Sequence, residues 1–413
     1  MHLAGAMHDG SPMATRTFSE RRLSHVNDAL ARHVARGYAS GAVALVSRHG
    51  EDHAFARGTF AFGGGAPMAR NTIFRLASMT KPITAVAAMI LVEECKLRLD
   101  DSVEPLLPEL ANRKVLRAID APLDDTVPAT RPITLRDLLT FRAGYGEVVF
   151  AAPRAPLQRA LLESALPLSV WPFEGTSDDF MKRVGALPLA CQPGERWLYH
   201  LPAEILGVLV ARATGTTLGA FLRERIFEPL GMKDTAFSVP DRDLARLSTC
   251  YVADFATGKI VVRDEARGLW ARPPEFEGGG GGLVSTVDDL HAFGRMLLQG
   301  GRFGRERILS RAAVELMTTD QLSAEQKNAS PFFPEFWDRC SWGHGMGVIT
   351  RRTDVGRSVG SFGWDGAFGT SFWMDPKEDV VGILMVQRSP DALTFANPLS
   401  ADFWTSVYQA IAD

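Results

Sequence analysis

The sequence has little of what would tie a protein to a membrane or to nucleic acid. Its apolar stretches are broken by polar residues well before the roughly 18 residues needed to span a bilayer. The first residues lack the cationic start and the apolar run of about 7–15 residues that mark a secretory signal. The formal net charge is −3, which leaves no basic excess for nucleic acid or an anionic membrane. We therefore expect a soluble cytoplasmic protein that binds neither.

The sequence is also poor in disulfide and metal signals. Its four cysteines are widely scattered and form no CxxC pair: Cys95, Cys191, Cys250 and Cys340. Its nine histidines show no H-E-x-x-H or other metal-ligand spacing. We predict no disulfide framework, no metal and no cofactor, and the sequence does not specify an oligomeric state.

Three local patterns suggest functions that their context does not support. A run of five glycines at 278–282 is not followed by Gly-Lys-Ser/Thr, so we predict close backbone packing near a site rather than a phosphate loop. Gly356–Gly360 matches the G-x-S-x-G elbow of α/β-hydrolases, but no strand-then-helix pattern surrounds Ser358. We interpret Ser358 as a turn residue, and His344, which lies among glycines, as structural.

The chain of 413 residues, 46% of them hydrophobic, is long enough for two structural regions. Apolar runs bounded by turn residues predict strands near both ends of the chain, at 41–50, 53–62, 369–375 and 380–387. Apolar residues at helical spacing predict helices at 20–36, 78–97, 133–140, 202–214, 218–227, from 285 onward, and 398–412.

This order of elements predicts an α+β fold in which the two ends of the chain form one antiparallel sheet flanked by helices, with an all-helical domain inserted between them. We expect a flexible tail over 1–19 and a discontinuous sheet domain over 20–77 and 335–413. The mainly helical domain would span 78–334, with the active site in the cleft between the two domains.

Ser78 and Lys81 form an S-x-x-K motif at the start of the helix predicted over 78–97. Residues three apart lie on one helix face, so the lysine amine can reach the serine hydroxyl. A serine needs such a base, and a partly buried lysine with a lowered pKa can supply it. The helix start adds free N–H groups near a developing oxyanion. The motif alone does not separate a catalytic pair from a chance match on a capped helix.

A tyrosine would be needed to relay protons with Lys81, and the chain has only five. Tyr199 lies in a loop that runs into a predicted helix, a common position for catalytic residues. We predict Tyr199 as the partner. Tyr145, between two glycines, is the alternative, and we expect it to line the pocket.

Three segments together resemble a known family. FRLASMTKPIT is similar to the S-x-x-K box of class C β-lactamases, DD-peptidases and family VIII carboxylesterases, and PGERWLYH resembles their second box. Gly363–Thr370 resembles the third box, where β-lactamases have K-T-G or H-T-G and family VIII esterases often have W-G-G. TTLGAFLRERIFEPLGMKDTAF and EGGGGGLVSTVDDLHAFGRMLLQGG are also typical of the superfamily. The resemblance extends from about residue 20 to the C-terminus.

The resemblance implies a role for each matched position. Ser78 would be the acylated nucleophile, with Lys81 and Tyr199 sharing the general-base and general-acid work. The backbone N–H groups of Ser78 and Ala367 would form the oxyanion hole. The residues that would line the substrate site along an edge strand are Trp364, Asp365 and Gly366.

Two departures from the family pattern bear on the substrate. The second box ends in Leu201 rather than Asn, so the amide that would bind a peptide or lactam is missing. The third box begins with Trp364 rather than Lys or His, so no cation is placed to bind a carboxylate. Both departures favour a carboxylesterase acting on short-chain or small aromatic esters. A β-lactamase, DD-peptidase or amide hydrolase, and an acyltransferase to a small-molecule acceptor, remain as alternatives.

Overall fold

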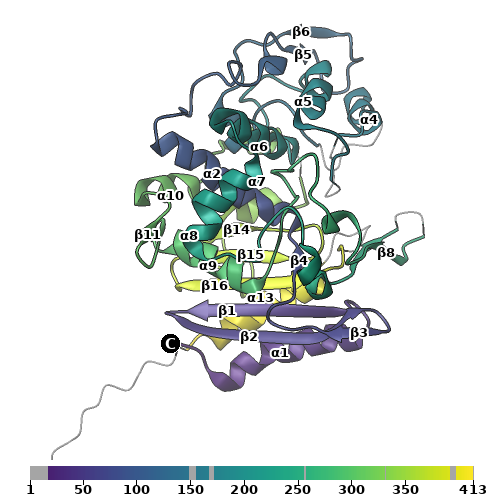
Figure 1. The fold of residues 1–413 in the computed structure, drawn as a ribbon. Helices are drawn as coiled ribbons and strands as arrows, with labels where there is room; N and C mark the ends of the chain where they lie inside the picture. Colours follow the sequence, from purple (N-terminus) through teal and green to yellow (C-terminus); the bar gives the residue numbers. More distant parts are fainter. Residues whose placement is uncertain are drawn as a thin grey trace, which may run out of the picture.

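The computed structural model describes residues 17–147, 155–166, 172–254, 257–330, 332–390 and 397–412. Its centre is an eight-stranded sheet in which all neighbouring strands are antiparallel (Figure 1). In spatial order the strands are β12 (Cys340–Trp342), β13 (Gly347–Ile349), β14 (Phe362–Asp365), β15 (Ser371–Asp375), β16 (Val380–Val386), β1 (Gly41–Arg48), β2 (Glu51–Ala61) and β3 (Gly64–Pro67). Because β16 pairs with β1, the predicted joining of the two ends of the chain into one sheet is confirmed.

Helices cover both faces of this sheet. Alternate side chains of β1 enter different cores, as the period of a strand requires: Val43 and Leu45 on one side, Ala44 and Val46 on the other. Helix α9 (Val287–Leu298) packs on the first side, and α1 (Glu20–Ala35) with α13 (Pro398–Ala410) on the second. A strand buried on both faces has to be apolar throughout, which explains the unbroken apolar run of β1.

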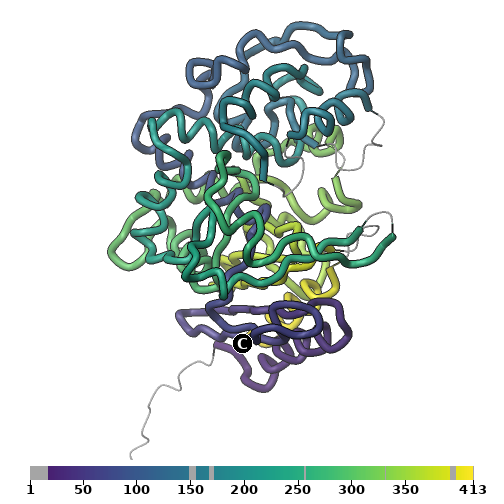
Figure 2. Tube along the Cα trace, turned by 45° about the vertical axis from the view of Figure 1, so that its right-hand side comes forward, coloured from purple at the N-terminus to yellow at the C-terminus, as the bar shows by residue number. Residues whose placement is uncertain are grey.

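The start and the end of the described chain lie side by side (Figure 2). Phe18 is 3% exposed and pairs with Ile411, and the Ser19 N–H donates to the Ala410 carbonyl at 2.8 Å. Residues 1–16 of the predicted tail lie outside the described residues. The prediction was wrong for the last residues of the tail, because an aromatic side chain at Phe18 has a core to enter.

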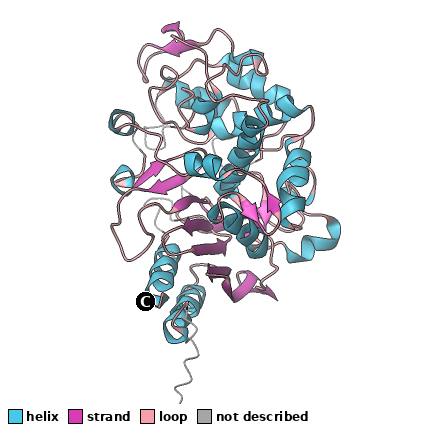
Figure 3. Ribbon diagram, turned by 90° about the vertical axis from the view of Figure 1, so that its left-hand side faces the viewer, coloured by secondary structure: helices cyan, strands magenta, loops and turns pink. Residues whose placement is uncertain are grey.

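Most of the remaining helices gather on one side of the sheet (Figure 3). Two long apolar helices, α2 (Thr80–Glu93) and α6 (Leu201–Thr214), pack against each other. The others are α3 (Leu135–Leu139), α4 (Pro156–Glu163), α5 (Ser177–Ala186), α7 (Leu218–Leu222), α8 (Glu228–Leu230), α10 (Arg311–Met317), α11 (Ala324–Asn328) and α12 (Phe336–Arg339). Helix α9, although inside the predicted helical region 78–334, packs on the sheet.

Short strand pairs and helical turns connect these helices. The pairs are β4 (Phe74–Arg75) with β9 (Val284–Ser285), β5 (Lys114–Leu116) with β6 (Thr126–Pro128), β7 (Cys250–Ala253) with β8 (Ile260–Asp264), and β10 (Arg302–Phe303) with β11 (Glu306–Arg307). The turns are η1 (Ala77–Met79), η2 (Pro108–Leu110), η3 (Arg223–Phe227), η4 (Asp241–Arg246) and η5 (Leu269–Ala271).

The helix predicted to end near residue 227 continues to Leu230. Pro229 does not stop it, because it lies in the first turn of α8, directly after the π-helical turn η3 interrupts the regular i to i−4 hydrogen bonds. Gly231, left-handed at φ 69°, ends it. In the described part of the chain, no single helix is long and apolar enough to cross a bilayer. One pair of consecutive helices, Leu201–Thr214 with Leu218–Leu230, is together long and apolar enough to cross a bilayer, but the two are bent by 78° relative to each other.

Candidate active site

Ser78 lies where the small β4–β9 ladder meets the long helix α2. The ladder continues into a Leu76 N–H to Leu283 O hydrogen bond of 2.8 Å, and Ser78 follows in the turn η1. Ala77 has φ +49°, a conformation that non-glycine residues seldom adopt. Ser78 is 4% exposed, and it occupies the first turn of the helical segment, where N–H groups have no intrahelical acceptor.

Lys81 lies one turn further on and is 1% exposed. Its Nζ is 2.9 Å from Ser78 Oγ, 2.6 Å from the Gly280 carbonyl oxygen and 3.1 Å from His200 Nδ1. The helix spacing therefore brings the predicted nucleophile and base into hydrogen-bond contact, and two further acceptors complete the surroundings of the amine.

Burial governs the charge of this amine. Burial lowers the pKa of Lys81 to about 7, although the carboxylates of Glu204 and Glu147 act in the opposite direction. Burial also raises the pKa of Glu147 to about 8, against the effect of Lys81. Both groups are thus drawn toward their neutral forms near pH 7, and a neutral Lys81 is able to accept a proton from Ser78.

Tyr199 enters the site from the loop before α6. Its backbone pairs with Glu147 in a short antiparallel bridge, with the Glu147 N–H donating to Tyr199 O at 2.9 Å. Its hydroxyl hydrogen-bonds Ser78 and accepts a 2.6 Å hydrogen bond from the Trp364 indole, and its ring centroid is 4.8 Å from Lys81 Nζ. Burial raises the pKa of Tyr199, so the hydroxyl stays protonated and acts as a donor.

Two further residues belong to this site and were not predicted from the sequence. His200 and Glu204 are 2% and 3% exposed, and His200 Nε2 is 3.3 Å from Glu204 Oε1. The two are four residues apart at the start of α6, a spacing that places them on one face and that could have been noticed in the sequence. We call the five residues the nucleophile cluster: Ser78, Lys81, Tyr199, His200 and Glu204.

The glycine run passes through the middle of this cluster. A Cβ at Gly280 would lie 2.6 Å from Glu204 Oε1, and one at Gly279 would lie 2.7 Å from the Ala203 carbonyl oxygen. Larger residues would force the run away from α6, and the Gly280 carbonyl would no longer accept from Lys81. The prediction that these glycines allow close packing near the site is confirmed.

The third box brings one side chain, Trp364, into contact with the nucleophile cluster. We had expected β14 to be the edge strand of the sheet. It is not, because β13 and β12 lie beyond it. Its pairing with β13 ends at Gly363, however, so Trp364 extends past that partner and reaches Tyr199. The Asp365 carboxylate accepts hydrogen bonds from Ser371 and Trp373, and Trp373 packs in the same core as Trp364.

The turn after β14 lies against the residues that precede Ser78. The Gly366 N–H donates to the Thr370 carbonyl at 2.8 Å, and a Cβ at Gly366 would lie 2.4 Å from the Leu76 carbonyl oxygen. Among the described residues, no backbone carbonyl accepts a hydrogen bond from the Ala367 N–H. This close approach is compatible with the oxyanion hole that we predict from the N–H groups of Ser78 and Ala367.

Tyr145 does not reach this site. It is 1% exposed, its hydroxyl donates to the Leu187 carbonyl at 3.3 Å, and its ring lies 5.9 Å from the Arg113 guanidinium. The expectation that Tyr145 lines the pocket is therefore corrected to a packing role. The two glycines beside it allow the backbone to approach other loops: a Cβ at Gly144 would lie 2.6 Å from the Cys191 carbonyl oxygen.

The residues interpreted as structural are likewise held by neighbours outside the cluster. The Ser358 hydroxyl accepts from Arg352 at 2.7 Å, and its N–H donates to Asp375. His344 is fully buried, with Nδ1 3.3 Å from the Leu316 carbonyl oxygen, and burial lowers its pKa to about 4. Within the described ranges, no group of three or more His, Cys, Asp or Glu side chains could hold a metal ion.

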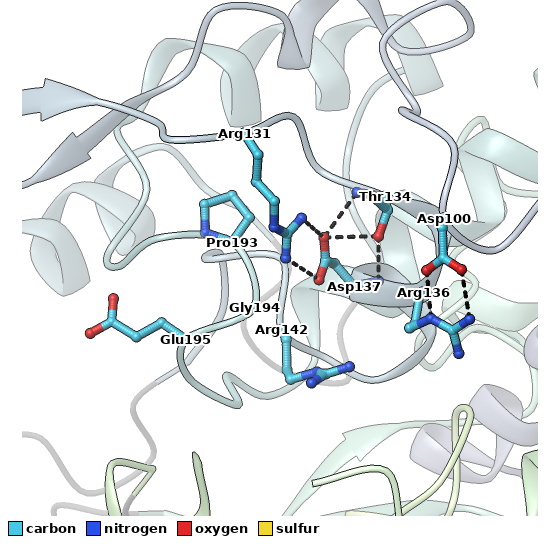
Figure 4. A pocket seen from close by; sticks show the side chains of 9 residues that line it. All are labelled: Asp100, Arg131, Thr134, Arg136, Asp137, Arg142, Pro193, Gly194 and Glu195. Carbon is cyan, nitrogen blue, oxygen red and sulfur yellow. Dashed lines mark hydrogen bonds and ion pairs between the residues drawn. The ribbon is translucent and has the colours of Figure 1, made fainter. Parts of the chain in front are cut away.

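A second polar region lies around α3 and the loop at 193–195 (Figure 4). We call this cavity of about 610 Å³ the arginine pocket. It is lined by Asp100, Arg131, Thr134, Arg136, Asp137, Arg142, Pro193, Gly194 and Glu195. Arg131 pairs with Asp137, and Arg136 pairs with Asp100. None of the predicted site residues lines it.

Comparison with known proteins agrees with the three boxes. A family model described as Beta-lactamase matches residues 26–402. Protein Rv1367c of Mycobacterium tuberculosis is 39% identical over 338 residues, which cover 79% of this chain and 80% of that protein. Esterase EstB of Burkholderia gladioli is 28% identical over 389 residues, covering 89% and 90%.

Solved structures share the fold. EstCE1, described as a hydrolase with promiscuous acyltransferase activity, superposes with a TM-score of 0.74 at 24% identity and covers 94% of this chain and 98% of its own. The resemblance and the α+β fold class predicted from the sequence are confirmed.

Proposed function

The chain belongs to the beta-lactamase family and is a serine hydrolase of that superfamily, and we propose that it is a carboxylesterase acting through an acyl-Ser78 intermediate. The observation that carries this proposal is the 2.9 Å contact between Ser78 Oγ and a buried Lys81 whose pKa is lowered to about 7. A base whose pKa lies near the working pH is half neutral and transfers protons efficiently.

In the acylation step, Ser78 Oγ attacks the ester carbonyl carbon and its proton moves to Lys81 Nζ. The N–H groups of Ser78 and Ala367 would bind the oxyanion as it forms. When the intermediate collapses, the bond to the alcohol oxygen breaks, and that oxygen takes a proton from the Tyr199 hydroxyl. Lys81 returns the proton to Tyr199, and its amine is neutral again.

Deacylation reverses these roles. A water molecule gives its proton to the neutral Lys81, directly or through Tyr199, and attacks the acyl carbon. Ser78 leaves with the proton held by Lys81, and the acid product departs. The raised pKa of Tyr199 supports its role as a proton donor and relay rather than as a tyrosinate base.

The surroundings of Tyr199 support a neutral, apolar substrate. Its ring lies 5.3 Å from Phe332 and 5.9 Å from Trp364, and Trp364 lies 4.7 Å from Trp342. The Trp364 indole N–H is already bound to Tyr199 and carries no charge for a carboxylate. Short-chain and small aromatic esters suit such walls better than an anionic lactam or peptide.

Acyl transfer to a small alcohol is a second candidate. The same aromatic side chains keep water away from the acyl group, which favours an apolar acceptor over hydrolysis. The description of EstCE1 as a hydrolase with promiscuous acyltransferase activity points in the same direction.

The test uses the purified protein with p-nitrophenyl acetate and butyrate, nitrocefin and a D-amino-acid amide. We expect turnover of the nitrophenyl esters and little of the other two substrates. Rapid turnover of nitrocefin or the amide would replace the esterase proposal with one of those activities. Repeating the ester assay with added butanol and quantifying butyl ester separates transfer from hydrolysis.

A fluorophosphonate probe locates the nucleophile independently of the substrate. We expect the adduct on Ser78 by mass spectrometry, and Ser78→Ala should lower kcat/KM at least about 10³-fold. Ser358→Ala is the control and should keep its activity, since Ser358 contacts none of the cluster. An adduct on Ser358, or an active Ser78→Ala variant, would overturn the proposal.

A further inference from the structure

His200 has a backbone conformation that needs an explanation. Its φ of 73° and ψ of −66° form a tight γ-turn, closed by a 3.0 Å hydrogen bond from the Leu201 N–H to the Tyr199 carbonyl. A non-glycine residue is strained in this conformation and persists in it only when its surroundings hold it there. The turn directs the imidazole inward, next to Lys81, while the neighbouring Tyr199 side chain also points into the site.

Glu204 biases which nitrogen of His200 carries the proton. Its carboxylate lies 3.3 Å from Nε2, a charge contact outside hydrogen-bond geometry, and its negative charge favours a proton on that nitrogen. Nδ1, which is 3.1 Å from Lys81 Nζ, is then an acceptor. The Gly280 carbonyl on the other side of the amine is also an acceptor.

This arrangement defines the direction of the lysine lone pair. A neutral amine has two N–H bonds and one lone pair in a tetrahedral arrangement. With its two N–H bonds donated to His200 Nδ1 and Gly280 O, the third direction faces Ser78 Oγ, which is 2.9 Å away. Without the His200 acceptor the amine can rotate, and its lone pair points at Ser78 for only part of the time.

We propose that His200, held by Glu204, is a positioning residue that orients the neutral Lys81 amine toward Ser78. The inference rests on the proposed function, because it concerns the base of the same acylation step. It adds to the Ser78, Lys81 and Tyr199 set a second pair that acts through Lys81 and does not touch the substrate.

Several charged or titratable groups face Lys81, and a pH test has to account for each. Ser78 approaches from η1, Tyr199 and Glu147 from the bridged loops, and His200 and Glu204 from the start of α6. Of these, the Glu204 carboxylate exerts the largest upward effect on the pKa of Lys81. Its removal therefore lowers that pKa and lets the neutral base persist at lower pH.

The first experiment compares His200→Leu with His200→Asn. Leucine fills space without an acceptor, whereas asparagine offers a short amide acceptor and tolerates positive φ. We expect His200→Leu to lower kcat for p-nitrophenyl butyrate roughly 10–100-fold with KM nearly unchanged, and His200→Asn to recover much of the loss. Labelling of Ser78 by the fluorophosphonate probe should slow in parallel.

The second experiment measures kcat/KM against pH for Glu204→Gln. Glutamine keeps the size of the side chain and removes its charge, so the plateau should remain within a few-fold of the original, while the acidic limb moves to lower pH. A purely structural role for Glu204 would change stability and leave the limb in place.

The outcomes separate the inference from the function on which it rests. If wild-type Ser78 is labelled and His200→Leu is as fast as wild type, the positioning role is overturned and the esterase proposal stands. Equal impairment of folded His200→Leu and His200→Asn overturns the role as an acceptor. If His200→Leu does not fold, His200→Gly takes its place, because glycine tolerates the positive φ and offers no side-chain acceptor; wild-type activity in that variant overturns the inference. Absence of Ser78 labelling in the wild type contradicts the proposed function instead.

Discussion

The nucleophile cluster and the arginine pocket are built partly from the same stretch of chain, residues 193–204, and yet their charges behave in opposite ways. In the pocket, ion pairs raise the pKa of Arg131 and Arg136, and Arg136 lowers the pKa of Asp100. Arg142 is the exception there, because burial lowers its pKa. In the cluster, burial lowers the pKa of Lys81 to about 7 and raises that of the nearby Glu147 to about 8.

The difference lies in solvent and in partners. Arg131 and Arg136 each have a carboxylate within 3 Å and one side open to water, so both ions remain charged. Glu147 Oε1 is buried without a hydrogen-bond partner among the described residues, and Lys81 is surrounded by neutral acceptors. Paired, solvated charges hold a loop in place, whereas buried charges without full pairing titrate near neutrality and can move protons.

The largest expected effect is at Lys81. Lys81→Met should lower kcat/KM about 10²–10⁴-fold, because the base that accepts the Ser78 proton is gone. Its free energy of unfolding should stay equal or increase, since a buried amine is replaced by an apolar side chain of similar length. Ester hydrolysis and urea denaturation measure the two quantities.

Lys96→Met is the matched control, because Lys96 is an exposed lysine paired with Glu94 at 2.9 Å. We expect its activity to be unchanged. If Lys81→Met retains a tenth of the wild-type activity, the buried amine is not the catalytic base, and the cluster would not differ in function from the solvated charges.

Tyr199→Phe tests whether the proton relay belongs to the cluster alone. We expect kcat to fall about 10²-fold, because the hydroxyl that protonates the leaving alcohol is lost. Tyr145→Phe removes a buried hydroxyl that bonds the Leu187 carbonyl and Arg113, and should cost about 1 kcal/mol of stability with activity preserved. Similar activity losses in the two variants would show that general packing, rather than the relay, controls the rate.

Glu147→Gln sharpens the contrast in pKa. The folded-state pKa of Glu147, about 8, lies above its ordinary value of 4.5. The stability contribution of this group is therefore fully present below pH 4.5 and is lost as the pH rises through 8. The variant lacks this loss, so its free energy of unfolding should gain on the wild type by on the order of 4 kcal/mol between pH 4.5 and pH 8. A constant difference across urea titrations at several pH values would contradict the raised pKa.

The smallest effects on chemistry are expected in the arginine pocket. Asp137 pairs with Arg131 and also caps α3 through Thr134, and its side chain is 4% exposed. Asp137→Asn should therefore lower the free energy of unfolding by about 1–2 kcal/mol and leave kcat/KM within roughly twofold. Asp100→Asn, at an exposed pair, should cost less than about 1 kcal/mol. A tenfold loss of activity in either variant would show that the arginine pocket contributes to catalysis at the nucleophile cluster.

Much of this arrangement could be predicted because its signals are local. An apolar run such as β1 has to be buried on both faces, and the matching run of β16 near the other end of the chain is a suitable partner. The S-x-x-K spacing needs only the geometry of one helical turn.

The remainder depends on backbone conformations that composition does not reveal. A histidine after a loop tyrosine would point away from the site in an extended chain, and only the γ-turn at φ 73° turns His200 toward Lys81. Glycines around Tyr145 suggested an open pocket, but Gly144 and Gly146 bring the loop against Cys191 and Tyr199 instead. In both cases tertiary contacts decide the direction of the side chain.

The pairing of β1 with β16 has a consequence for the order in which the molecule can be made. The ribosome releases the chain from its N-terminal end, so the first strand of the sheet has to wait for the last while almost all other segments are synthesised. Throughout that interval β2 is the only sheet partner available to β1. The turn at 366–370, which approaches the residues before Ser78, comes shortly before β16 in the sequence and is therefore also synthesised late. The protein is therefore expected to be without a completed nucleophile site until β16 has been synthesised, and a nascent chain stalled before β16 should depend on chaperones to cover the apolar strand β1.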